Sequence, residues 1–355
     1  MRRIGILTSG GDSPGMNAAI VSVARTAALY HMELVGIKRG YNGLLRKRAD
    51  IMDDMQVFDS ETVLDIADQP GTFLRTARCI EFLNPDVRAK AAENLKGMGI
   101  DGLIVIGGDG SFQGAKALCD LGIPCIGIPG TIDNDLAYTE HTLGFDTAVN
   151  ICINSVRMIR ATSRSHDRVA VVEVMGRNSG EIALRTAMCT GAEIVIVPEV
   201  SWGVYPIAER INQLMKIGDM RATVIVAEGV FKNQSMEPFD AYGLLSSYDA
   251  NYQNIHSPNE PMNAKTLSEV LRRLSPGCDA RATVLGYIQR GSAPFAYDAG
   301  FAFEAGHLAV MLLREGISEQ VIGIRRGRVY YLPIREALAT KPIFDRKLYD
   351  LVNSL

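Results

Sequence analysis

Short apolar runs alternate along the chain with longer segments in which apolar and polar residues repeat at helical spacing. The apolar runs predict strands at 4–7, 33–37, 103–106, 124–128, 168–174, 193–197, 223–227, 282–288 and 321–324. The segments with helical spacing predict helices at 15–29, 85–98, 112–121, 149–162, 180–189, 263–274 and 299–314. Because strands and helices alternate, the pattern indicates an α/β fold built on a doubly wound, mostly parallel sheet.

The length of the chain and its apolar content point to more than one domain. It has 355 residues, of which 47% are apolar, and this is more than a single hydrophobic core usually holds. Residues 232–263 interrupt the pattern, because they are rich in Asn, Ser, Pro and Tyr and show little periodicity. We expect this segment to be a long loop or an insertion.

Charge and cysteine usage narrow the class of protein. The net charge is −3 and there is no basic block, so we expect no binding to nucleic acid or to a membrane surface. No stretch is long and apolar enough to span a bilayer, and none of the six cysteines forms a CxxC pair. These features favour free thiols in a reducing compartment, and we expect a cytoplasmic location.

Three of the predicted strands end in a loop that contains glycine and an acidic residue. These loops are 8–12 (TSGGD), 107–111 (GGDGS) and 129–135 (PGTIDND). In parallel sheets, ligands bind beyond the carboxyl ends of the strands, so the three loops are expected to meet at one edge. Their composition indicates a single polyphosphate and metal site made from several loops.

The loop at 107–111 has the features of a phosphate-binding segment. Glycines after a strand let backbone N–H groups approach phosphate oxygens, and the following helix adds positive potential. Asp109 in this loop is suited to hold Mg²⁺, directly or through water. The same residues are equally consistent with a tight turn capped by an acid, and they match neither the Walker A nor the GxGxxG pattern.

The loop at 129–135 offers groups for phosphoryl transfer to an alcohol. Asp133 is a candidate to accept the hydroxyl proton, and Thr131 to donate a hydrogen bond to the migrating phosphoryl group. Asp135 is a candidate to orient the loop or water around a metal ion. A simpler interpretation is a turn stabilised by aspartate side chains, with both acids solvated.

Several charged residues at strand ends suit an anionic substrate. Arginine binds phosphate through two parallel hydrogen bonds, and candidates stand at the start or just past the end of predicted strands: Arg168, Arg177, Arg281 and Arg290. Arg78 follows a glycine turn and is a candidate partner of a nucleotide phosphate, and Glu228 of sugar hydroxyls. The alternatives are surface ion pairs for the arginines, and a helix cap or an ion pair for Glu228.

Five motifs in this order resemble those of the bacterial ATP-dependent 6-phosphofructokinases. They are the loops at 8–12, 107–111 and 129–135, and the segments 171–177 (VVEVMGR) and 286–291 (GYIQRG). The resemblance runs from about residue 3 to about residue 330 and is interrupted at 232–263. Each motif alone is weak, but chance does not explain five of them at compatible spacing.

This resemblance implies two similar doubly wound α/β domains with the active site in the cleft between them. The larger, ATP-binding domain is expected at 1–144 plus about 289–339. The smaller, sugar-phosphate domain is expected at about 145–288 plus about 340–355, with the insertion at 232–263. The implied reaction is the glycolytic phosphorylation of fructose 6-phosphate at its 1-hydroxyl, which gives fructose 1,6-bisphosphate and ADP.

The resemblance also implies roles for individual residues. Asp133 is the expected base, Thr131 and Arg177 surround the transferring phosphoryl group, and Asp135 is a further catalytic candidate. The residues expected near ATP, with Mg²⁺ at the aspartate, are Gly11, Arg78, Cys79, Gly108, Asp109, Gly110 and Ser111. The residues expected to contact the sugar phosphate are Thr131, Asp133, Arg168, Met175, Gly176, Arg177, Glu228, Arg281, Tyr287 and Arg290. In the family, the residues that match Arg168 and Arg281 come from a neighbouring subunit, so a homotetramer is expected.

Three positions bear on the substrates. Pyrophosphate-dependent members of the family tend to carry Asp where this chain has Gly110 and Lys where it has Gly130, so both glycines favour ATP. Tyr287 stands where close family members have His, at the sugar-phosphate end. A pyrophosphate-dependent or broader sugar-phosphate kinase therefore remains an alternative. A ligand-sensing subunit without activity is another, although the intact acids argue against it.

An effector site is also implied between subunits of the family. Four residues match it: Arg25, Arg160, Gly191 and Glu193. Val21 and Asp219 stand where basic side chains are usual in the family. Loss of two cations from a phosphate site weakens the binding of an anion, so we expect weak or altered regulation.

Overall fold

A computed structural model describes residues 1–45, 55–58, 63–231 and 263–354. Within them the chain forms two compact units. Unit 1 consists of Met1–Ala148 and Arg290–Ile343, and unit 2 of Val149–Gln289 and Phe344–Leu355. The insertion expected at 232–263 lies outside the described residues, apart from Asn263 at its end.

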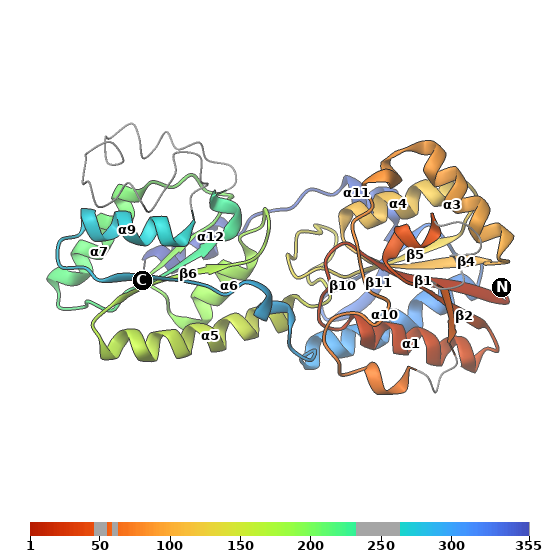
Figure 1. The fold of residues 1–355 in the computed structure, drawn as a ribbon, viewed down its shortest axis with the longest axis horizontal. Helices are drawn as coiled ribbons and strands as arrows, with labels where there is room; N and C mark the ends of the chain where they lie inside the picture. The colour runs from red at the N-terminus through yellow and green to blue at the C-terminus, as the bar shows by residue number, and fades with distance from the viewer. Residues whose placement is uncertain (46–54, 59–62, 232–262, 355) are drawn as a thin grey trace. The chain divides into compact units, whose positions relative to one another are not determined.

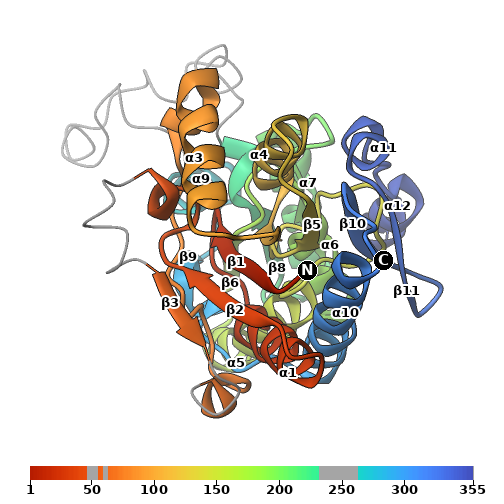
Figure 2. The same ribbon diagram turned by 90° about the vertical axis from the view of Figure 1, so that its right-hand side faces the viewer.

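Unit 1 is built on a seven-stranded sheet in the order β11-β10-β5-β4-β1-β2-β3. The strands are β1 Arg3–Ser9, β2 Glu33–Ile37, β3 Met55–Phe58, β4 Gly102–Gly107, β5 Cys125–Pro129, β10 Gln320–Arg325 and β11 Arg328–Pro333. The five inner strands run parallel, whereas β3 and β11 pair antiparallel at the two edges, as Figure 2 shows. The predicted mostly parallel sheet is confirmed.

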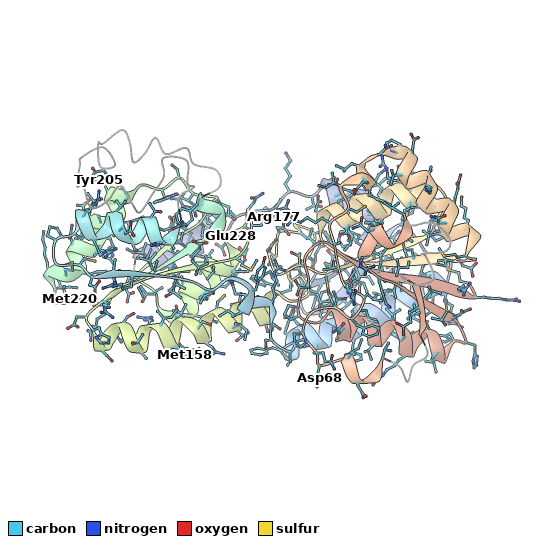
Figure 3. All side chains as sticks on the ribbon, viewed as in Figure 1. Asp68, Met158, Arg177, Tyr205, Met220 and Glu228 are labelled. Carbon is cyan, nitrogen blue, oxygen red and sulfur yellow. The ribbon has the colours of Figure 1, made fainter. Side chains whose placement is uncertain are left out.

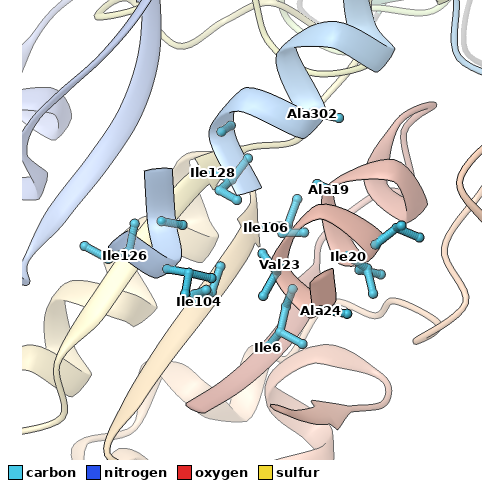
Figure 4. Packing of buried hydrophobic residues seen from close by; sticks show 14 of the residues in the cluster. Ile6, Ala19, Ile20, Val23, Ala24, Ile104, Ile106, Ile126, Ile128 and Ala302 are labelled. Carbon is cyan, nitrogen blue, oxygen red and sulfur yellow. The ribbon is translucent and has the colours of Figure 1, made fainter. Parts of the chain in front are cut away.

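The inner strands are apolar throughout because both faces of the sheet are covered. In β4, Ile104 and Ile106 belong to one core, while Leu103 and Val105 belong to the other. The first of these cores is shown in Figure 4, where isoleucines of β1, β4 and β5 pack against small residues of two helices. A near-continuous apolar run is the pattern expected of a parallel strand buried on both faces.

Among the described residues of unit 1, helices cover both faces of this sheet (Figure 1). On one face lie α1 (Met16–Leu29) and α10 (Ala296–Arg314), and on the other α3 (Pro85–Gly97), α4 (Asp109–Asp120) and α11 (Ile334–Ala339). The first pair packs closely, because a Cβ atom at Gly306 would lie 2.6 Å from Cβ of Ser22. Short 3₁₀ turns η1, η2 and η3 span Gly40–Leu44, Leu64–Ile66 and Ile80–Leu83.

Unit 2 has a smaller sheet in which all four strands run parallel, in the order β7-β8-β6-β9. Its strands are β6 Val169–Val174, β7 Ile194–Ile196, β8 Thr223–Ala227 and β9 Ala280–Val284. Its helices are α5 Phe145–Ser165, α6 Glu181–Thr190, α7 Val204–Lys216, α9 Ala264–Leu274 and α12 Arg346–Ser354, and α5 and α9 lie on opposite sides of the sheet (Figure 1). The side-chain amide of Asn353 in α12 pairs with the backbone of Val195 in the edge strand β7. Its Oδ1 accepts from the N of Val195 at 2.9 Å, and its Nδ2 donates to the carbonyl of Val195 at 3.2 Å.

The start of α5 is held by a buried carboxylate of unit 1. Asp298, which is 1% exposed, accepts hydrogen bonds from the backbone N of Gly144 and of Thr147, both at 2.7 Å. The hydroxyl of Thr147 also donates to it, at 2.6 Å. These bonds satisfy N–H groups that the first turn of a helix leaves without partners.

The structure corrects several expectations about individual elements. The strand predicted at 282–288 is wrong beyond Val284, because Gly286 has φ +53° and opens the 3₁₀ turn η5 (Gly286–Arg290). The helix predicted at 112–121 begins earlier, at Asp109, and α5 begins at Phe145. The strands β3 and β11 and the helices α7 and α11 were not predicted. No described helix is long and apolar enough to cross a membrane.

Candidate active site

Three neighbouring strands of unit 1 place the predicted loops side by side. The strands β1, β4 and β5 are consecutive in the sheet and end at the same edge. The backbone N of Gly130 donates to the carbonyl of Gly107 at 3.0 Å, and the hydroxyl of Ser111 donates to the carbonyl of Ser9 at 3.1 Å. The loops that follow these strands are therefore bonded directly to one another.

The middle loop becomes a helix sooner than predicted. Gly108 is the N-cap of α4, and no side chain forms a hydrogen bond to cap this helix. Asp109 and Gly110 are exposed in its first turn, and a Cβ atom at Gly110 would meet no atom within 4 Å. A Cβ atom at Gly108 would lie 3.9 Å from Cβ of Thr131, which follows β5. The N-terminus of α4 is thus an open, positively polarised position beside the 129–135 loop.

The segment that carries Arg78 lies against the first glycine loop. Gly10 N donates to the carbonyl of Ala77 at 3.4 Å, and the hydroxyl of Thr76 donates to the carbonyl of Gly10 at 3.0 Å. Arg78 is exposed and Cys79 is half-buried immediately after these contacts, and burial raises the pKa of the Cys79 thiol. The structure thus brings both residues close to the loop of Gly11.

Arg290 also belongs to unit 1, whereas the other arginines predicted for the sugar phosphate belong to unit 2. Its guanidinium donates a hydrogen bond to the backbone carbonyl of Asp12. A Cβ atom at Gly11 would lie 3.1 Å from Nη1 of Arg290, so only a small residue fits there without moving the guanidinium. Arg290 therefore lies beside the first glycine loop.

The loop with the candidate base is held by its own polar groups. The backbone N of Asp133 donates to the hydroxyl of Thr131 at 3.2 Å. Asn134 has a left-handed backbone with φ +49°, and its side-chain oxygen accepts from the backbone N of Thr142 at 2.9 Å. Thr142 in turn donates its hydroxyl to the carbonyl of Thr131 at 2.6 Å. Asp133 and Asp135 are both half-buried, and Thr142 is a residue that sequence reasoning missed.

In unit 2, the loop after β6 brings together three of the predicted residues. Arg177 is exposed and has a left-handed backbone with φ +55°, and its backbone N donates to Oε1 of Glu228 at 2.9 Å. Figure 3 labels both residues. A Cβ atom at Gly176, where φ is +135°, would lie 2.3 Å from the carbonyl oxygen of Ser179, and one at Gly229 would lie 2.2 Å from that of Arg177. Tight backbone packing and one carboxylate therefore define this loop.

Arg168 and Arg281 share one acidic partner. Nε of Arg168 lies 2.7 Å from Oδ2 of Asp279, and Nε of Arg281 lies 2.8 Å from Oδ1 of the same carboxylate. Burial raises the pKa of Asp279, but hydrogen bonds and charges of the two arginines outweigh it, so the net shift is downward. The ion pairs foreseen as an alternative for these arginines are present, and they place both guanidinium groups side by side.

A comparison with known protein families shows the family of the chain. The family model described as Phosphofructokinase matches residues 3–313. This chain belongs to the phosphofructokinase family. The family that the five sequence motifs predicted is thereby confirmed.

Named relatives agree with this family. The chain is 44% identical to a protein of Clostridium botulinum named ATP-dependent 6-phosphofructokinase, over 100% of this chain and 99% of that protein. A solved phosphofructokinase from Saccharomyces cerevisiae has 30% identity and a TM-score of 0.81, and this chain spans 50% of its length. A pyrophosphate-dependent phosphofructokinase from Marinobacter aquaeolei has 20% identity and a TM-score of 0.76, with 99% and 91% of the two chains covered, and shows the shared fold.

Three of the four residues expected at the effector site of this phosphofructokinase chain lie together. Arg160 donates to the carbonyls of Thr190 and Gly191, the second at 3.1 Å, and it pairs with Glu193 at 3.1 Å. Its guanidinium therefore binds the C-terminal end of α6. Arg25 belongs to unit 1 and lies over the ring of Phe303, 5.8 Å from its centre. Val21 and Asp219 stand where basic side chains are usual in the family. Val21 is fully buried, and Asp219 forms an ion pair with Arg221.

The described residues offer a carboxylate to a metal ion but no complete set of ligands. Among the described residues, no group of three or more His, Cys, Asp or Glu side chains could hold a metal ion. Mg²⁺ is commonly bound by one or two carboxylates together with substrate phosphates and water. Asp109 suits this arrangement, because it is exposed and only its Oδ2 accepts a hydrogen bond from Gln113, at 2.6 Å.

Proposed function

We propose that this chain is an ATP-dependent 6-phosphofructokinase. It transfers the γ-phosphoryl group of ATP to the 1-hydroxyl of fructose 6-phosphate, and the products are fructose 1,6-bisphosphate and ADP. The observation that carries this proposal is the 44% identity to an enzyme of that name over the full length of the chain. The reaction is a step of glycolysis, and we place it in the cytoplasm with its substrates.

In this proposal, the strand ends of unit 1 bind the nucleotide. The uncapped first turn of α4, with Gly108 and Gly110, offers backbone N–H groups to the phosphates. Gly11, Arg78, Cys79 and Ser111 belong to the segments that are bonded around it. Asp109 would hold Mg²⁺, which neutralises charge on the phosphate oxygens when it is bound.

The chemical step is assigned to the 129–135 loop. The oxygen of the sugar 1-hydroxyl bonds to the γ-phosphorus while the bond between this phosphorus and the β-phosphate oxygen of ADP breaks. Asp133 accepts the proton that the hydroxyl loses. Thr131 donates to the transferring group, and Asp135 holds the loop in place. Arg177 of unit 2 stabilises the negative charge that develops on the phosphoryl oxygens.

The sugar phosphate is assigned mainly to unit 2. Met175, Gly176, Glu228 and Tyr287 are proposed to bind it, together with Arg290 from unit 1. The sugar hydroxyls are assigned to the carboxylate of Glu228, whose Oε1 also accepts a hydrogen bond from the backbone N of Arg177. We propose a homotetramer in which Arg168 and Arg281, already aligned by Asp279, serve the site of a neighbouring subunit.

Gly110 is the better of the two indicators of the phosphoryl donor. A Cβ atom there would meet no protein atom within 4 Å, so the packing of the chain itself does not require a glycine. At Gly130, in contrast, a Cβ atom would lie 2.8 Å from Cγ2 of Ile106 and 3.0 Å from Cε of Met16. Packing therefore accounts for Gly130 with either donor, and the preference for ATP rests on Gly110.

A coupled assay of fructose 1,6-bisphosphate formation with Mg²⁺ tests both the function and the donor. We expect turnover with ATP and none with pyrophosphate. We also expect Gly110→Asp to raise KM for ATP by about tenfold or more, because a carboxylate repels the phosphates in that space. The control Gly110→Ala adds a Cβ atom without charge and should keep the melting temperature of the original chain.

Other outcomes would replace the proposal. Turnover with pyrophosphate instead of ATP would make the chain a pyrophosphate-dependent enzyme. Turnover only with another sugar phosphate would point to Tyr287 and a broader specificity. ATP binding without turnover of any sugar phosphate would indicate a ligand-sensing subunit.

A further inference from the structure

Gln289 is a buried polar residue to which none of the roles above is assigned. It lies in η5, where unit 2 ends and unit 1 resumes, and its side chain is 0% exposed. Its Oε1 accepts from the backbone N of Met175 at 3.1 Å and from Sγ of Cys152 at 3.1 Å. Its Nε2 donates to the carbonyl of Gly286 at 2.9 Å. The amide thus uses both its oxygen and its nitrogen.

Only an amide of this length can make this set of bonds. An amide offers an acceptor oxygen with two lone pairs and an NH₂ donor on one planar group. A glutamate in place of Gln289 would lack the donor, and a methionine would lack both groups while filling a similar volume. The thiol of Cys152 is a suitable donor, because burial raises its pKa to about 12 and keeps it protonated.

The partners of Gln289 belong to two segments that are assigned to the sugar phosphate. Met175 begins the loop that contains Arg177, whose backbone N is held by Glu228 at 2.9 Å. Gly286 directly precedes Tyr287, whose side chain is 84% exposed. One buried amide therefore joins the loop after β6 to the turn that presents Tyr287, while the carboxylate of Glu228 holds the other end of the loop.

We propose that Gln289 is a positioning residue for sugar-phosphate binding, acting through the backbone of Met175 and Gly286. This inference rests on the proposed function. In this role Gln289 does not contact the substrate itself. It sets the distance between the Met175–Arg177 loop and Tyr287. Loss of the bond would leave the partly buried N–H of Met175 without this partner, so the loop would shift to reach water.

The test is Gln289→Met, with Cys152→Ala as the matched control that removes a bond to the same oxygen but leaves both substrate segments attached. In Gln289→Met we expect KM for fructose 6-phosphate to rise by about tenfold or more, with KM for ATP unchanged within about twofold. In Cys152→Ala both constants should stay within about twofold of the original chain. A role in folding alone would change both KM values together.

Amide hydrogen exchange gives a second readout that needs no activity. The backbone N–H of Met175 should exchange about tenfold faster in Gln289→Met and at its normal rate in Cys152→Ala. If Gln289→Met does not fold, Gln289→Glu replaces it, assayed at a pH at which the new carboxyl is ionised, since an ionised glutamate keeps the acceptor for Met175 but loses the donor to Gly286. That variant should raise KM for fructose 6-phosphate without changing exchange at Met175.

The outcomes separate this inference from the proposed function. If the original chain shows no turnover, the proposed function fails, and the inference fails with it unless binding of fructose 6-phosphate, measured by calorimetry, is weaker in Gln289→Met. An unchanged KM for fructose 6-phosphate in an active, folded Gln289→Met would overturn the inference. Equal increases of both KM values with a lower melting temperature would overturn it as well.

Discussion

In unit 1, the residues proposed for ATP lie mainly in loops at the ends of adjacent parallel strands and in the first turn of α4. In unit 2, the loop after β6, which carries residues proposed for the sugar, is held by hydrogen bonds to side chains. The bonds that join the unit-1 loops include Gly130 to Gly107, which is purely backbone. The loop after β6 depends on Glu228 and Gln289, each of which bonds a single backbone N–H.

This difference predicts where substitutions matter. Where backbone groups hold a site, as between Gly130 and Gly107, its shape survives the replacement of a side chain that makes none of the holding bonds. Substitution of such side chains in unit 1 should therefore alter chemistry or ligand binding directly. A loop held by buried polar side chains moves when one of them is lost, because the remaining N–H group is left unpaired. In unit 2, residues that never touch substrate should therefore affect its binding.

The largest expected effect tests the first half of this comparison. Asp133→Asn removes the proposed proton acceptor but keeps the shape of a loop held by Thr142 and Asn134. We expect kcat to fall by about 10²–10⁴ with a much smaller change in KM for fructose 6-phosphate. Steady-state kinetics measure this, with Asp350→Asn on the exposed face of α12 as the control. A variant with nearly full kcat would remove Asp133 from the mechanism.

A smaller effect concerns Asp298, a buried carboxylate of unit 1 that binds backbone N–H groups. Burial raises the pKa of Asp298 to about 6, although its bonds to Thr147 and Gly144 act in the opposite direction. The folded chain thus binds a proton that the unfolded chain releases near pH 3.8. The stability from this group is complete below about pH 4 and is lost as the pH rises through about 6.

Asp298→Asn should therefore change the pH dependence of stability. The unfolding free energy of the original chain, relative to the variant, should decrease by about 3 kcal/mol between pH 4 and pH 7, from a shift of about two pKa units. Urea denaturation at several pH values measures this difference, and Asp350→Asn should show no such trend. A difference that is constant with pH would mean that Asp298 has a similar pKa in both states.

The smallest expected effect concerns regulation. Because Arg160 already binds the carbonyls of α6 and Val21 is buried, we expect ADP or phosphoenolpyruvate to change KM for fructose 6-phosphate by less than about twofold. Rates against fructose 6-phosphate, with and without each effector, measure this. Strong cooperative inhibition by phosphoenolpyruvate below millimolar concentration would contradict it.

The sequence predicted the parts of this fold that repeat a local pattern. The inner strands of unit 1 are apolar on both faces, so their positions and parallel arrangement could be inferred. The edge strand β3 has four residues and no comparable pattern, and the apolar run of β9 continues past Val284, where the strand ends. Local pattern therefore locates cores better than it locates edges and turns.

Site residues divide in the same way. Glycine loops at strand ends are visible in the sequence, so the 8–12, 107–111 and 129–135 loops could be named. Glu228 could be named as a candidate too, but its bond to Arg177 and the role of Gln289 could not be inferred, because these partners lie 51 and 114 positions from Arg177 and Met175. Only tertiary structure brings such partners together.

The division of the chain between the two units has a consequence for biosynthesis. As the polypeptide leaves the ribosome, the sheet of unit 1 must wait for β10, which pairs with β5 and arrives after nearly all of unit 2. Unit 2 in turn waits for α12, whose Asn353 completes the edge strand β7. The sheet of unit 1 therefore stays incomplete while unit 2 is synthesised, whereas unit 2 has all four of its strands before β10 emerges and lacks only α12.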